Sequence, residues 1–145
     1  MKALRDITPE DFAQRSGELD ELTCKRAKHV ITEDERTMKA IVAMQENDAV
    51  TMGKLMYASH ESLRDDFEVS SDALNDMVEI AMEQEGCFGA RMTGAGFGGC
   101  AVALVAEENA ADFVEKTIAL YTEKTGNDPA VYVCQATQGA SVVSS

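Results

Sequence analysis

Half of the chain's ten glycines gather in one short stretch, Gly89 to Gly99, within the sequence GARMTGAGFGG. Glycine adopts left-handed backbone angles at little cost and lets a main chain approach a ligand closely. Successive N–H groups in such a loop can form a concave site for an anion such as phosphate. The same glycines also suit a wide hairpin that does no chemistry, and the spacing alone favours neither interpretation.

Two well-known phosphate motifs do not fit this loop. Gly94, Gly96 and Gly99 have the G-x-G-x-x-G spacing, but a dinucleotide site needs a strand before the glycines and a helix after them. The unbroken apolar run Cys100 to Val105 predicts instead a second strand, buried on both faces. No Gly-Lys-Ser/Thr follows, which excludes a P-loop. We therefore expect a glycine-rich connection between two strands.

Two polar residues flank the glycines. The Thr93 hydroxyl can donate a hydrogen bond to a phosphate or substrate oxygen, although an exposed turn threonine is the commoner case. Arg91 lies inside the expected first strand, and we expect it to pair with a surface carboxylate.

Other chemically capable side chains are expected to have structural roles. His29 and His60 lie on helical segments, without a cysteine or carboxylate at the spacing of a metal site or a catalytic triad. The acidic residues Asp65, Asp66 and Glu68 are expected to form a solvated face rather than a metal site.

The elements that position the loop follow from periodicity and caps. Thr8, which precedes a proline, is typical of a helix start, and Thr32 with Glu35 has capping-box spacing. Ser71 can cap a further helix, for which Gly86 is the expected C-terminal cap. The first half of the chain therefore reads as helical.

The second half changes to a strand pattern. We expect strands at Phe88 to Met92 and Cys100 to Val105, a helix over 113–121 that ends at Gly126, and a last strand at Ala130 to Ala136. The tail SVVSS could add a short edge strand. The prediction is an α+β fold in which a helical half precedes a β-loop-β-α-β unit whose sheet is covered by helices.

Length and charge limit the possible partners. A chain of 145 residues is expected to form one domain. The net charge of −13 repels phosphate backbones and anionic membranes, so we expect neither a nucleic acid nor a membrane partner. The four cysteines are widely spaced and contain no C-x-x-C pair, which indicates reduced thiols in a cytoplasmic protein.

Three segments, in order, resemble one enzyme family. GARMTGAGFGGC resembles the third signature motif of the GHMP small-molecule kinases. SHESLRDDFEVSSDALNDMV, which runs from Ser59 to Val78, resembles the galactokinase branch of that family. AVYVCQATQGA resembles the galactokinase C-terminus, so that the similarity extends from about Leu4 to Ala140.

The resemblance implies that residues 1–145 are the C-terminal domain of a galactokinase, with a ferredoxin-like sheet, and that the N-terminal ATP- and sugar-binding domain lies outside this chain. Galactokinases transfer the γ-phosphoryl group of ATP to the C1 hydroxyl of galactose, with Mg²⁺. The family's catalytic aspartate and Mg²⁺ ligands belong to the other domain, so we assign no catalytic or metal residue here and expect this chain alone to be inactive.

What the resemblance carries over is a loop close to nucleotide, phosphate and substrate. Its residues are Thr93, Gly94, Ala95, Gly96, Phe97, Gly98 and Gly99. Ala95 stands where many members have glycine, which excludes a backbone angle that only glycine adopts there. Ser62 and Arg64 are expected to contact the other domain. Alternatives are another GHMP sugar kinase, such as one acting on N-acetylgalactosamine, a stand-alone module that binds an anionic metabolite, and an interaction domain whose loop is only a turn.

Overall fold

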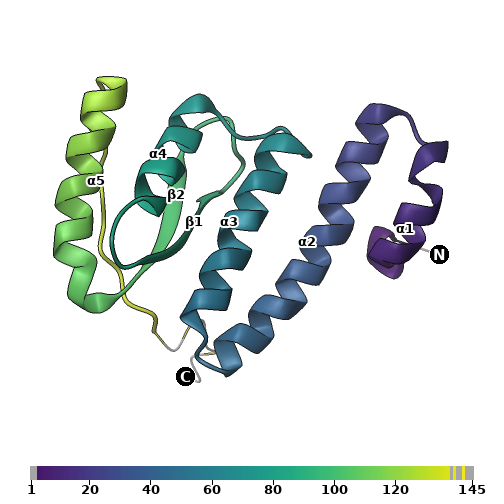
Figure 1. Ribbon diagram of the computed structural model, residues 1–145, viewed down its shortest axis with the longest axis horizontal. Helices are drawn as coiled ribbons and strands as arrows, with labels where there is room; N and C mark the ends of the chain where they lie inside the picture. The colour runs from purple at the N-terminus through teal and green to yellow at the C-terminus, as the bar shows by residue number, and fades with distance from the viewer. Residues whose placement is uncertain (1–2, 138, 140–141, 143–145) are drawn as a thin grey trace.

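Helices dominate the molecule, and two strands lie among them. The computed structural model describes residues 3–137, 139 and 142. In chain order its elements are η1 (Leu4–Asp6), α1 (Pro9–Arg15), η2 (Ser16–Glu18), α2 (Glu21–Gln45), α3 (Ala49–Asp65), α4 (Asp72–Met82), β1 (Cys87–Thr93), β2 (Cys100–Val105), η3 (Glu107–Asn109) and α5 (Ala110–Thr125). Figure 1 shows them standing side by side, from α5 through α4 and the strands to α3, α2 and α1.

Two of the three helix starts indicated by capping residues in the sequence are confirmed, and one is not. Thr8 caps α1 and Ser71 caps α4, because each side-chain oxygen accepts a hydrogen bond from a main-chain N–H. Thr32 starts no helix, since α2 runs through it and its hydroxyl donates to the Lys28 carbonyl one turn earlier. The expected capping box of Thr32 with Glu35 is therefore wrong.

The helix ends show where glycine is needed. Gly126 follows α5 with a φ of 73°, as expected of a left-handed cap. Helix α4 ends earlier than expected, at Met82, so Gly86 is not its cap. Gly86 instead forms the turn before β1, with a φ of 81°, and a Cβ atom there would collide with the Asn109 side chain.

Strands β1 and β2 form an antiparallel hairpin that closes on the glycine loop. The register pairs Thr93 with Cys100 beside the loop and Cys87 with Val105 at the far end. A strand and not a helix follows the glycines, which agrees with the exclusion of a dinucleotide-binding fingerprint. The α+β fold class and both strands of the hairpin are confirmed.

The expected third strand does not form in the described residues. Residues 130–136 have no regular secondary structure there, and Tyr132 is 83% exposed. A strand needs a neighbour for its N–H and C=O groups, and the described sheet pairs β1 only with β2. The prediction of a strand at Ala130 to Ala136 is therefore wrong for this chain. Most of the tail SVVSS lies outside the described residues.

The hydrophobic core lies where α4 and α5 meet the hairpin. A cluster of four buried residues forms its centre: Val78, Ala81, Ala90 and Phe113. Ala101 and Ala103 of β2 pack against this cluster, whereas Val102 between them is 47% exposed. This alternation is typical of a sheet covered on one face, so the expected burial of β2 on both faces is wrong.

Helix α3 approaches the hairpin more closely than side chains would permit. Gly53 of α3 faces Gly89 of β1, and a Cβ atom on either residue would overlap main-chain atoms of the opposing element. The pair lets the helix backbone lie against the strand backbone. Strand β1, and with it the start of the glycine loop, is thereby fixed relative to α3.

Candidate functional site: the glycine-rich loop

The loop between β1 and β2 has a backbone conformation that requires its glycines. Five of its residues have positive φ: Gly94 (86°), Gly96 (82°), Phe97 (60°), Gly98 (130°) and Gly99 (108°). Ala95 does not have a positive φ, so the expectation that this position avoids a glycine-only angle is confirmed. A side chain at the four glycines would be strained, because L-residues rarely adopt these angles.

One main-chain contact joins the middle of the loop to the rest of the molecule. The Phe97 N–H donates to the Val69 carbonyl over 2.7 Å. A Cβ atom on Gly96 would overlap that same carbonyl oxygen, whereas one on Gly94 would meet nothing within 4 Å. Val69 was missed by sequence reasoning, because its contribution is a carbonyl that every residue type carries.

Most main-chain donors of the loop remain available to a ligand. Within the described residues, the Phe97 N–H is the only main-chain donor from Gly94 to Gly99 that has a hydrogen-bond acceptor in the protein. Thr93, Ala95 and Phe97 are exposed, and the Phe97 side chain is 75% exposed. Unpaired N–H groups in a glycine-rich turn are the donors from which anion sites are built, so this donor set fits a phosphate.

A buried histidine supports the strand that leads into the loop. The Met92 N–H donates to Nδ1 of His60 over 3.3 Å, and both side chains are only 1% exposed. Burial lowers the pKa of His60, which keeps the ring neutral and able to accept this hydrogen bond. Its Nε2 has no hydrogen-bond partner in the described part of the molecule. The structural role expected for His60 agrees with this geometry.

Arg91 belongs to a polar cluster between α2, α3 and β1. Its Nη1 lies 3.3 Å from Oε1 of Glu33, which also accepts a hydrogen bond from the Ser59 hydroxyl, while Arg36 pairs with the other oxygen. Burial acts to raise the pKa of Glu33, but the hydrogen bonds from Ser59 and Arg36 and the two arginine charges hold it below its usual value. The cluster lines a hollow of about 140 Å³. Arg91 therefore pairs with a carboxylate as expected, here a half-buried one.

Two of the three acidic residues expected to form a solvated face pair with α2, and one of these two is mostly buried. Asp66 pairs with Lys28 at 2.8 Å and Glu68 pairs with Arg26 at 2.7 Å. Asp66 is only 13% exposed, so the expected solvated face is wrong at this residue. No three His, Cys, Asp or Glu side chains come together as a metal site among the described residues.

The two residues expected to contact another domain differ in position. Ser62 is buried and hydrogen bonds with His29 and Asp66, so its hydroxyl already has partners within this chain. Arg64 is partly exposed and pairs with Asp65, whose hydrogen bond raises the pKa of the guanidinium. Of the two, Arg64 alone remains accessible from outside.

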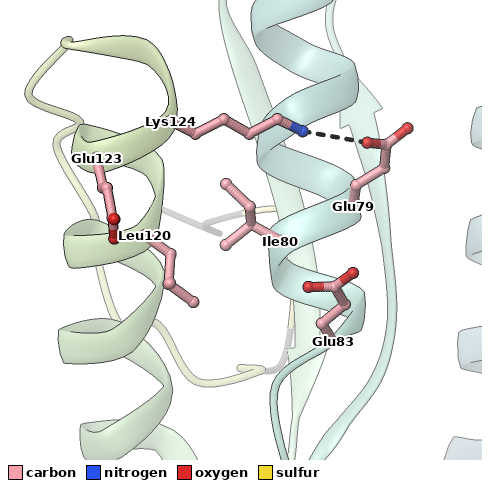
Figure 2. Close-up of a pocket in the computed structure, with 6 residues that line it drawn as sticks. All are labelled: Glu79, Ile80, Glu83, Leu120, Glu123 and Lys124. Atoms are coloured by element: carbon pink, nitrogen blue, oxygen red, sulfur yellow. Dashed lines mark hydrogen bonds and ion pairs between the residues drawn. The ribbon is translucent and has the colours of Figure 1, made fainter.

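A second hollow, of about 360 Å³, lies between α4 and α5. Figure 2 shows the residues that line it: Glu79, Ile80, Glu83, Leu120, Glu123 and Lys124. Lys124 is paired with Glu79 at 3.4 Å and with Asp76 at 2.7 Å. The hollow is lined by three carboxylates and by one ammonium group whose charge is already paired, so it repels an anion. The glycine loop is therefore the better candidate for a phosphate site.

Comparison with known proteins places this chain in a family. Residues 40–121 match the family model of the GHMP kinases C terminal, a range that includes the whole glycine loop. The chain belongs to the GHMP kinases. The family match begins within α2 and ends at Tyr121 in α5, so it includes the hairpin, the buried core cluster and the Val69 contact.

Relatives within the GHMP kinases are longer than this chain. A galactokinase of Clostridium beijerinckii is 48% identical over 140 residues, which are 96% of this chain and 36% of that protein. A galactokinase of Haemophilus influenzae is 47% identical in an alignment of 148 residues in length. This alignment covers 99% of this chain and 38% of that protein. The chain thus spans little more than a third of the length of these relatives.

A solved structure agrees with the fold. The crystal structure of Lactococcus lactis galactokinase complexed with galactose superposes with a TM-score of 0.84 at 40% identity. The superposition covers 88% of this chain and 33% of that one.

None of the helices in the described part of this chain has both the length and the apolar composition that crossing a bilayer requires.

Proposed function

We propose that this chain is the C-terminal part of a galactokinase, which transfers the γ-phosphoryl group of ATP to the C1 hydroxyl of galactose. The observation that carries the proposal is the match of 96–99% of this chain to proteins named galactokinase at 42–48% identity. We assign the remaining length of those relatives to an N-terminal domain that would bind ATP and galactose and supply the catalytic aspartate.

The glycine loop has the properties that this reaction needs from a C-terminal part. Phosphoryl transfer depends mainly on positioning and on electrostatic stabilisation of the phosphate oxygens. The N–H groups of Gly94 to Gly99, except the Phe97 N–H, are unpaired and can stabilise such oxygens without supplying a base or a nucleophile. Mg²⁺ would neutralise phosphate charge when bound, and the resemblance to galactokinases assigns its ligands to the N-terminal domain.

An exposed apolar surface supports the existence of a docked second domain. Four large side chains near the end of α2 and the start of α3 are half exposed or more: Met38, Val42, Met44 and Val50. Large apolar side chains exposed in one region of a protein commonly mark an interface. We place the enzyme in the cytoplasm, where ATP is available and where the four free cysteines would remain reduced.

A hybrid enzyme tests the proposal. The matched C-terminal third of the Clostridium beijerinckii galactokinase is replaced by this chain, and ADP release and galactose 1-phosphate are measured with galactose and ATP. We expect turnover from the hybrid and none from either part alone. Gly96→Val should lower turnover by at least about a hundredfold, because the loop is displaced from Val69.

Gly17→Ala is the matched control, since Gly17 has open space around it and lies far from the loop in sequence. It should keep the turnover of the hybrid. A hybrid that folds, as judged by circular dichroism, but releases no ADP with galactose would contradict the proposal.

A further inference from the structure

The contact between Val69 and the glycine loop is the last link of a continuous series of contacts that begins on α2. Val69 belongs to the connection between α3 and α4, residues 66–71, here named the 66–71 connection. The Val69 carbonyl receives the Phe97 N–H and leaves no room for a Cβ atom on Gly96. The loop is therefore held at its midpoint by this connection as well as at its ends by the two strands.

The 66–71 connection is itself folded tightly onto the end of α3. The Phe67 N–H donates to the Ser62 carbonyl over 2.9 Å, and the Val69 N–H donates to the Leu63 carbonyl over 3.0 Å. Between them Glu68 has a φ of 57°, a left-handed angle that a glutamate adopts only when surrounding contacts enforce it. The position of the Val69 carbonyl is thus set by contacts on both sides of it.

One arginine of α2, Arg26, makes several side-chain contacts with the 66–71 connection. Nη1 of Arg26 donates to the Asp66 carbonyl over 2.6 Å, and Nη2 donates to the Glu68 carboxylate over 2.7 Å. The same guanidinium lies 5.7 Å from the centre of the Phe67 ring. The hydrogen bond from Arg26, and to a smaller extent that from Lys25, lowers the pKa of Glu68 and keeps its carboxylate charged. A planar, forked donor is needed to reach a carbonyl and a carboxylate together.

We propose that the 66–71 connection is the positioning element of the glycine loop and that Arg26 is the side chain that holds this connection in place. The catalytic consequence rests on the proposed galactokinase function: phosphate-binding N–H groups stabilise a transition state only if they are fixed before the reaction. A glycine-rich loop loses more conformational entropy on ordering than other loops, and the Val69 contact reduces the ordering that substrate binding must still achieve.

Amide exchange in the 145-residue chain tests the structural part. By NMR, the Phe97 amide should exchange at least about tenfold faster in Gly96→Ala than in Gly94→Ala. The two variants are matched, because Gly94 and Gly96 have nearly the same φ, 86° and 82°, and only Gly96 lies against the Val69 carbonyl. Equal acceleration in both variants would overturn the proposal.

Arg26→Gln tests the role of the arginine. The Phe97 amide should exchange about tenfold faster in this variant, while the Tyr121 amide in α5 keeps its rate. Arg26→Lys should restore only part of the protection, because an ammonium cannot reach the Asp66 carbonyl and the Glu68 carboxylate together. Equal acceleration at Phe97 and Tyr121 would mean that the change only destabilises the fold, and would overturn the proposal.

The hybrid enzyme tests the catalytic part. Arg26→Gln should lower kcat about tenfold and leave KM for galactose within about twofold, because a misplaced donor affects the transition state more than sugar binding. Faster Phe97 exchange with an unchanged kcat would overturn the positioning role in catalysis. An unsubstituted hybrid without turnover would overturn the proposed function, while the exchange measurements would still decide whether the connection holds the loop.

Discussion

The two segments with the strongest strand composition, Cys100 to Val105 and residues 130–136, have opposite structures. The first pairs with β1 across a hairpin and packs its alternate residues on α4 and α5. The second has no regular secondary structure, and Val133 within it is 68% exposed. Apolar, β-branched residues favour a strand only where a neighbour satisfies the main chain. A hairpin provides that neighbour locally, and the end of this chain has none among the described residues.

The largest expected effect comes from breaking the support of the hairpin. Gly53→Ala would normally stabilise a helix by about 1 kcal/mol, but here the new Cβ meets the main chain of β1. We expect the free energy of unfolding to fall instead, by about 2–3 kcal/mol, as measured by urea denaturation. Gly17→Ala, with open space around it, should change it by less than about 0.5 kcal/mol. Equal values for the two variants would contradict the close contact of α3 with β1.

A smaller effect should separate the two strand-like segments directly. Leu104→Ala removes a half-buried side chain from β2 and should cost about 1–2 kcal/mol of unfolding free energy. Val133→Ala removes an exposed one and should cost less than about 0.5 kcal/mol. Thermal and urea unfolding of the chain compare the two. A similar cost for both would show that residues 130–136 pack against the fold in solution.

The smallest effect concerns two buried histidines, His29, which contacts α3, and His60, which contacts β1. Burial lowers the pKa of both His29 and His60, so the unfolded chain binds more protons than the folded one below the ordinary histidine pKa of about 6.5. Stability is therefore complete above that pH and should decrease as the pH falls from 7.5 to 5.5. His60→Asn keeps an acceptor for the Met92 N–H but does not titrate, and should show a shallower decrease. An identical pH dependence would exclude His60 as a contributor.

Local signals in the sequence predicted much of this fold. Thr8, Ser71 and Gly126 act where they were expected, because a cap depends on a few neighbouring residues. Thr32 was misjudged because its hydroxyl could find an acceptor inside a continuous helix, α2. Residues 130–136 were misjudged because strand formation depends on a partner distant in the chain.

The position of the glycine loop in the fold could be predicted from the sequence, but the residues that hold the loop in place could not. The apolar run that follows the glycines correctly indicated a loop between two strands, and the alanine at position 95 correctly excluded a glycine-only backbone angle there. The Val69 carbonyl leaves no trace in residue type, and the acidic residues Asp66 and Glu68 looked like surface charges until their partners on α2 were known. Long-range pairing of this kind is a property of tertiary structure and not of local pattern.

Phe97 is a suitable position for a fluorescent reporter in the loop. The chain contains no tryptophan, and Phe97 at the loop's midpoint is 75% exposed with a φ of 60°. An indole introduced by Phe97→Trp would therefore be the single emitting group of its kind in the molecule. Its fluorescence maximum would lie near that of a hydrated indole and would move to shorter wavelength whenever a nucleotide or another polypeptide covered the loop.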